Sequence, residues 1–200
     1  MTSTQHLPTT DRSTAPAATG GARLWIAAAA IALIVTALAA SVAKDLGHHG
    51  RAGFAVSGVF MSLSDLLLTL GVIAFVRADV VPAGGWRSVV RVLAVVGSAA
   101  SIGAEILLRV DFHTGNAAFG VAGPAQALGF IGLGVGVITG RRWSGWRRFA
   151  LLTLGLYVPA VLVPALAASG GQNLGALAGR HALALLVGLA WRQEEHRRLA

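Results

Sequence analysis

Residues 24–43 read LWIAAAAIALIVTALAASVA, a stretch without a charged side chain. An α-helix rises 1.5 Å per residue, so about 20 apolar residues cross the hydrocarbon core of a bilayer, which is about 30 Å thick. A cleaved signal peptide is the alternative, because Ser41, Val42 and Ala43 imitate a small-residue cleavage site. The apolar segment of a signal peptide usually has only about 7 to 15 residues. The stretch therefore predicts a first transmembrane helix.

The rest of the chain continues this apolar pattern. Of its 200 residues, 55% are hydrophobic and 12% are charged, whereas about 25% are charged in an ordinary soluble domain. Five further apolar segments cover residues 54–76, 89–108, 117–139, 149–168 and 174–191. Pro124 interrupts the fourth of the six spans, and Pro159 and Pro164 predict a bend in the fifth. We expect an all-α, polytopic membrane helical bundle of six transmembrane helices and exclude a water-soluble fold.

The two ends of the chain differ from the spans in composition. Residues 1–22 are rich in Thr, Ser, Ala, Gly and Pro, and they carry too little apolar surface to offset the entropy of ordering them. Residues 192–200 read RQEEHRRLA and are mostly charged. We expect a disordered cytoplasmic tail over residues 1–22, a six-helix transmembrane domain over 23–191, and a solvated cytoplasmic tail over 192–200.

Basic residues are distributed unequally between the two sides of the predicted bundle. With the N-terminus in the cytoplasm, twelve of the sixteen Lys and Arg residues fall on the inner side, which by the positive-inside rule places both termini in the cytoplasm. The tryptophans fall at the inner helix ends, where an indole can lie at the headgroup level. They are Trp25, Trp86, Trp143, Trp146 and Trp191. Because the basic residues lie mostly in the short connections between apolar segments rather than on one binding face, the net charge of +8 predicts no nucleic-acid partner.

Asp65 lies near the middle of the second span. A charged carboxylate at the centre of a membrane helix costs about 2.5 to 3.5 kcal/mol on insertion scales, so Asp65 must be neutral, paired or in contact with water. Gly58, Ser62, Asp65 and Thr69 share one helix face, which we expect to face other helices. This acid is therefore a candidate proton donor or acceptor. The structural alternative is a protonated Asp65 that only hydrogen-bonds a neighbouring helix.

Glu105 lies in the outer third of the third span, on a face shared with Gly97, Ser101 and Arg109. An ion pair with Arg109, four residues later, accounts for Glu105 without any function. The functional alternative makes Glu105 a second proton donor or acceptor beside Asp65, with both side chains lining one cavity.

Further polar residues fall in the same outer half of the membrane. Two positions are open for the Arg180 side chain. It can pair with Glu105 across helices, because an unpaired cation at this depth is unfavourable, or it can extend to the headgroups. Gln126 and Tyr157 have the alternative of hydrogen-bonding neighbouring helices. These residues predict a polar pocket that opens outward. Its expected lining, beside Asp65 and Glu105, is Ser62, Thr69, Ser101, Gln126, Tyr157, Arg180 and His181.

Glycines and histidines suggest two further features. Gly132, Gly136 and Gly140 form a GxxxGxxxG pattern that allows a close helix contact, within the chain or with a second subunit or membrane partner. The outer segments hold residue types found in zinc sites, namely Asp45, His48, His49, Asp111 and His113, but without the spacing of a metal motif. We expect no metal and no cofactor, and the absence of cysteine excludes disulfides and thiolate chemistry.

Residues 141–164, RRWSGWRRFALLTLGLYVPAVLVP, are followed by Gly-Gly-Gln-Asn and a short final helix. This part of the chain resembles small multi-pass membrane proteins of high-GC bacteria, and the resemblance implies six helices and an inner-membrane location. In a fainter way, Asp65 and Glu105 resemble the acidic residues of small integral-membrane terpene cyclases. That resemblance implies a compact helical bundle in which a buried acid protonates an isoprenoid.

Three functions remain open at this point. The first is proton-linked transport of a small solute, in which Asp65 takes up and releases the proton. The second is a structural or accessory role, in which the glycine face binds a partner in the bilayer. The third is acid catalysis on a lipophilic, isoprenoid-like substrate, with Asp65 as proton donor, Glu105 in a polar or basic role, and Phe60 or Tyr157 shielding a cation.

Overall fold

The computed structural model describes residues 19–45, 51–81, 84–169 and 173–199, and within these ranges the ordered elements are all helical. They are α1 (Thr19–Asp45), α2 (Arg51–Arg77), α3 (Trp86–Val110), α4 (Phe112–Thr139), α5 (Arg147–Tyr157), the π-helix η1 (Val158–Leu162), α6 (Val163–Ala168) and α7 (Leu174–Leu199). The elements α5, η1 and α6 form one continuous span, so six helices are long and apolar enough to cross a membrane. The predicted all-α bundle of six spans is confirmed.

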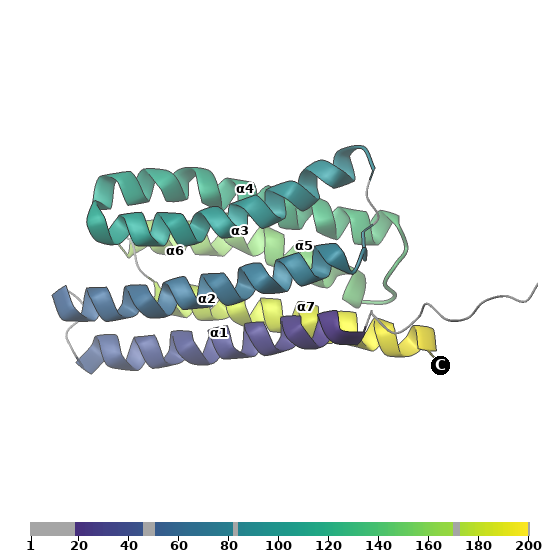
Figure 1. Ribbon diagram of the computed structural model, residues 1–200, viewed down its shortest axis with the longest axis horizontal. Helices are drawn as coiled ribbons and strands as arrows, with labels where there is room; N and C mark the ends of the chain where they lie inside the picture. The colour runs from purple at the N-terminus through teal and green to yellow at the C-terminus, as the bar shows by residue number, and fades with distance from the viewer. Residues whose placement is uncertain (1–18, 46–50, 82–83, 170–172, 200) are drawn as a thin grey trace, which may run out of the picture.

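The helices run side by side along the long axis of the molecule (Figure 1). Helix α1 packs against α2 and α7, and α4 packs against α3 and α5. Contacts of α2 with α3 and of α5 with α7 join these two groups into one bundle. The colours of Figure 1 show that the beginnings of α2, α4 and α7 lie at the same end of the bundle as the ends of α1, α3 and α6.

Helix α4 begins five residues earlier than the predicted span, because Asp111 caps it. The Asp111 carboxylate accepts hydrogen bonds from the backbone N–H groups of His113 (3.3 Å) and Thr114 (3.1 Å) and from the Thr114 hydroxyl. A capping carboxylate satisfies N–H groups that have no partner inside the helix. The hydrogen bonds from Thr114, side chain first, hold the pKa of Asp111 below its usual range.

Helix α7 continues to Leu199, so the described residues 192–199 are helical. Most of their side chains are exposed, namely Arg192, Gln193, His196, Arg197 and Arg198, and the solvated cytoplasmic tail stays a prediction. Glu194 in this part is buried at 6% exposure. Its carboxylate accepts from the Ser144 backbone N–H (2.8 Å) and pairs with Arg147 Nε (2.8 Å). These contacts hold the last turns of α7 against the α4–α5 connection. At the other end, α1 already includes residues 19–22, and the predicted disorder of residues 1–18 lies outside the described residues.

The predicted irregularity of the fifth span takes the form of a π-helical turn. Pro159 lies in η1, and Pro164 lies in the first turn of α6. A proline has no N–H to donate and its ring clashes with the preceding turn, so the hydrogen-bonding pattern must change around it. A π-helical turn is one such change and often occurs at functional sites. Pro124, in contrast, remains inside the continuous helix α4.

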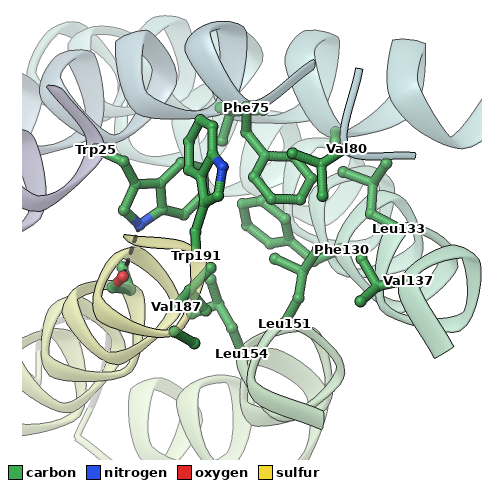
Figure 2. Close-up of a cluster of buried hydrophobic side chains, with 14 of the residues drawn as sticks. Trp25, Phe75, Val80, Phe130, Leu133, Val137, Leu151, Leu154, Val187 and Trp191 are labelled. Atoms are coloured by element: carbon green, nitrogen blue, oxygen red, sulfur yellow. Dashed lines mark hydrogen bonds between the residues drawn. The ribbon is translucent and has the colours of Figure 1, made fainter. Parts of the chain in front are cut away.

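An aromatic cluster forms the core at one end of the bundle (Figure 2). The Phe75 ring contacts the rings of Trp191, Trp25 and Trp143 at centroid distances of 5.1, 5.7 and 6.0 Å. Trp25 Nε1 donates to the carbonyl oxygen of Ala184 at 2.6 Å, which satisfies its polar atom inside the protein. Trp25, Trp143 and Trp191 are buried inside the protein, and the predicted headgroup level of the tryptophans stays a prediction.

Glycines allow the helices of this bundle to approach closely. A Cβ atom on Gly129 of α4 would lie 2.5 Å from the Cα of Ala94 of α3, and one on Gly134 would lie 2.6 Å from the backbone N of Leu152 of α5. In the GxxxGxxxG pattern, Gly136 faces the Val81 side chain of the same chain. Part of the pattern thus serves packing within the chain, and its use between subunits stays a prediction.

Candidate functional site

A cavity of about 660 Å³ lies in the half of the bundle away from the aromatic cluster. Its walls come from the first half of α7, from α2 and α4 between their first turns and just past their midpoints, from the second half of α3, and from η1 and α6. Most of the lining is apolar. The polar lining residues are Asp65, Ser101, Glu105, Asn116, Gln126 and Arg180. Five of the nine predicted site residues therefore meet in one cavity: Asp65, Ser101, Glu105, Gln126 and Arg180.

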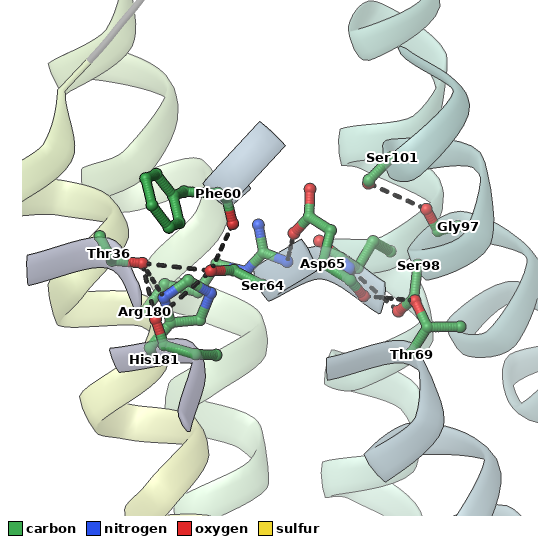
Figure 3. Close-up of polar contacts among 12 residues, drawn as sticks. Thr36, Phe60, Ser64, Asp65, Thr69, Gly97, Ser98, Ser101, Arg180 and His181 are labelled. Atoms are coloured by element: carbon green, nitrogen blue, oxygen red, sulfur yellow. Dashed lines mark hydrogen bonds and ion pairs between the residues drawn. The ribbon is translucent and has the colours of Figure 1, made fainter. Parts of the chain in front are cut away.

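Asp65 and Arg180 form an ion pair in the cavity wall (Figure 3). Arg180 Nη2 lies 2.8 Å from Asp65 Oδ1, and the two residues are only 4% and 5% exposed. The alternative that pairs Arg180 with Glu105 is therefore wrong. Asp65 has no basic residue within one turn on its own helix, so its partner must come from another helix, because an unpaired charge inside a membrane bundle is unfavourable.

Glu105 pairs with Arg109, one turn later on α3, as the local alternative predicts. Residues four apart on a helix are neighbours, and the order Glu before Arg is the favourable one. Arg109 also lies over Gly58 of α2, where a Cβ atom would lie 2.7 Å from the guanidinium carbon. Gly58 therefore provides the space that the Arg109 side chain occupies.

Two other polar side chains of the cavity are fixed by contacts between and within helices. Gln126 Nε2 donates to Ser98 Oγ at 3.0 Å, which joins α4 to α3. Ser101 Oγ donates to the Gly97 carbonyl oxygen at 3.0 Å. Asn116 lines the cavity as well, although the sequence analysis placed it just outside the fourth span. The sequence feature that could have pointed to Asn116 is a single amide side chain next to the predicted start of that span.

Four predicted pocket residues do not line the cavity, namely Ser62, Thr69, Tyr157 and His181. The Thr69 hydroxyl donates to the backbone carbonyl of Asp65 at 2.7 Å. The Tyr157 hydroxyl donates to the Ala176 carbonyl at 2.9 Å. Ser62 is half-buried on α2. The first two hydrogen bonds satisfy hydroxyl groups in an apolar environment.

His181 belongs to a separate buried polar cluster between α1, α2 and α7. Its Nδ1 lies 3.0 Å from Thr36 Oγ1, and the Thr36 hydroxyl donates to the Ala32 carbonyl at 2.8 Å. Ser64 Oγ lies 3.5 Å from Thr36 Oγ1 (Figure 3). Thr36 and Ser64 were not among the predicted site residues; the sequence feature that pointed to this cluster is a single threonine in the middle of the charge-free first span.

No group of three His, Cys, Asp or Glu side chains that could hold a metal occurs within the described residues. Asp111 is the helix cap, and His113 is exposed beside it. His48 and His49 lie outside the described residues.

No family model, no curated protein and no solved structure matches this chain.

Proposed function

We propose that this multi-pass membrane protein binds a small solute in the cavity and carries it across the membrane in step with proton exchange at Asp65 and Glu105. The observation that carries the proposal is the Asp65–Arg180 ion pair in the cavity wall. Protonation of Asp65 removes the charge that holds Arg180, which releases guanidinium N–H groups for a solute. Proton binding and solute binding are then linked, as coupled transport requires.

The π-helical segment gives this cavity a movable wall. Val158 and Leu162 of η1 line the cavity, and Pro159 between them lacks the N–H of a regular helix. Because a π turn and an α turn differ in length and direction, a change between them would reshape the cavity beside the ion pair. This segment is our candidate for the gate between the two sides of the membrane.

We infer that the bundle lies in the cell inner membrane with both termini in the cytoplasm, because most Lys and Arg residues then fall on the inner side. A reporter that is active only in the cytoplasm, fused after Ala200, should be active. A reporter that is active only outside the cytoplasmic membrane should be silent at the same position. The opposite pattern would reverse the orientation and place the cavity at the inner side.

Proton-linked transport predicts that Asp65→Asn abolishes a proton-dependent current. The purified protein would be reconstituted in liposomes on a solid-supported membrane, and a panel of small alcohols, ketones, amines and carboxylates would be applied at two pH values. The asparagine keeps the size of the side chain but cannot exchange a proton or balance Arg180. Glu195→Gln removes a carboxylate in the last turns of α7, far from the cavity along the helix, and should keep the current.

A current of unchanged size in the Asp65→Asn variant would contradict the proposed role of this carboxylate. No current with any member of the panel would contradict transport. In that case a stable partner that copurifies with the chain would favour the accessory role.

The second candidate function is acid catalysis on a lipophilic substrate, like that of a terpene cyclase. It is favoured by the mostly apolar lining and by two aromatic lining residues, Phe112 and Phe119, since aromatic rings can stabilise a cationic intermediate. Phe60 and Tyr157, the aromatic residues expected from the sequence, are not among the lining residues. A new lipophilic product in extracts of expressing cells, absent with Asp65→Asn, would favour this function over transport.

A further inference from the structure

The cavity has a buried polar wall and an exposed rim that is apolar except for Asn116. Asp65, Glu105, Gln126 and Arg180 on its inner wall are each less than 9% exposed. The rim consists of exposed residues from two helices. They are Phe112, Asn116, Gly120 and Pro124 of α4 and Val163 and Ala167 of α6.

This rim forms a slot along the side of the bundle. The α4 residues of the rim recur every four positions from Phe112 to Pro124, which corresponds to about 18 Å along the helix axis. Helix α4 packs against α3 and α5 but has no comparable contact with α6. The slot thus runs parallel to the helices, and in a bilayer this side of the bundle faces hydrocarbon.

The charges in and beside the cavity are already balanced. Asp65 is paired with Arg180, and Glu105 is paired with Arg109. A charged solute would have to displace one partner, and breaking a buried ion pair leaves an uncompensated charge. The paired groups therefore favour a solute whose head is polar but uncharged.

Arg180 in the wall keeps a hydrogen-bond donor for such a head, in addition to the amide of Asn116 on the rim. Within the described part of the chain, the buried Nε–H of Arg180 has no hydrogen-bond partner, although Nη2 of the same side chain is bonded to Asp65. A buried donor without a partner is unfavourable. An oxygen atom is the acceptor that matches this donor.

We infer that the solute of the proposed transport is a lipid-soluble molecule with a hydroxyl or carbonyl head, and that it enters sideways from the bilayer between α4 and α6. Its apolar body lies against the rim and the apolar lining, and its oxygen accepts from Arg180 Nε–H. This inference rests on the proposed function, because it names the class of solute and its route into the same cavity.

Photolabelling in native membranes tests this inference. The probe is an alkyne-tagged hexadecanol with a diazirine in its alkyl chain, and labelled peptides are identified by mass spectrometry. Two probes with the same chain, one with a carboxylate and one with a trimethylammonium head, serve as comparison. We expect hexadecanol to label the cavity-lining peptides of α4 and α6 more strongly than either charged probe, and above the labelling of the lipid-facing surface of α3.

A matched pair of glycine variants tests the route. Gly120 lines the cavity, and a Cβ atom there meets no atom within 4 Å, so Gly120→Phe can place its ring in the slot from a position with free space at Cβ. Gly103 on α3 is exposed, is outside the cavity lining and has the same free space. Gly120→Phe should reduce hexadecanol labelling of the cavity to the level of the lipid-facing surface, whereas Gly103→Phe should leave it unchanged.

The possible failures of this inference and of transport are distinguishable. Equal labelling by the three probes would contradict the uncharged head, and labelling that Gly120→Phe does not change would contradict the lateral route. If a solute current is lost with Asp65→Asn but persists with Gly120→Phe, transport stands and the lateral route is wrong. If labelling follows the expected pattern but no current is found, the binding site stands and transport is wrong.

Discussion

Arg180→Met is expected to lower the free energy of unfolding by about 3 to 5 kcal/mol, the usual effect of removing one partner of a buried ion pair. The variant leaves the Asp65 carboxylate, only 5% exposed, without the guanidinium that now lies 2.8 Å away. The measurement is chemical or thermal unfolding of the purified protein in detergent. Arg192→Met is the matched control, since it makes the same change at an exposed position of the same helix.

Removal of both charges distinguishes the effect of a broken ion pair on stability from the effect of lost side-chain packing. The double variant Asp65→Leu with Arg180→Met contains no buried charge at this point, so it should recover most of the lost stability. If Arg180→Met were as stable as Arg192→Met, the ion pair would not hold α7 and α2 together. If the double variant were no more stable than Arg180→Met alone, the loss would come from packing.

Gly97→Ala is the second change with a large expected effect. A Cβ atom on Gly97 would lie 2.7 Å from the Cα of Gln126, so α3 and α4 would have to separate. Overpacking of this kind usually costs about 1 to 3 kcal/mol and sometimes more. The same contact positions Ser101 and Gln126, so the shape of the cavity should change with it. Thermal unfolding and hexadecanol photolabelling would measure the two effects.

Gly103→Ala on the same helix is the control for this change. No atom lies within 4 Å of a Cβ atom at Gly103, and alanine is the better helix former by up to about 1 kcal/mol. This variant should be as stable as the unchanged protein or slightly more stable. If Gly97→Ala and Gly103→Ala had the same unfolding temperature, α3 and α4 would not approach each other as closely as they do in the structure.

The six spans could be predicted from the sequence because hydrocarbon imposes a simple requirement of length and apolarity on each helix. The helix ends could not be predicted as well, because they depend on individual contacts. Asp111 extends α4 by capping it, and Glu194 holds the end of α7 by accepting from Ser144. Neither contact follows a periodic pattern of residues, so neither could be recognised in the sequence.

The site could be predicted in part, for a similar reason. A carboxylate such as Asp65 in the middle of an apolar span is recognisable from the sequence, because a charge at that depth of the membrane is energetically unfavourable. Its partner depends on the packing of distant helices, so the sequence suggested Glu105 for Arg180 where the structure has Asp65. His181 was assigned to the pocket from its depth in the membrane, whereas the rotation of α7 directs it to Thr36.

A single introduced cysteine tests most directly whether an accessible polar cavity reaches into this bundle. The chain contains no cysteine, so Ser101→Cys in the cavity wall and Ala184→Cys in the packed core each provide one thiol. The measurement is the rate of modification by N-ethylmaleimide in native membranes. We expect the thiol at position 101 to react and the thiol at position 184 to remain protected. Equal protection of both thiols would contradict the presence of an accessible cavity.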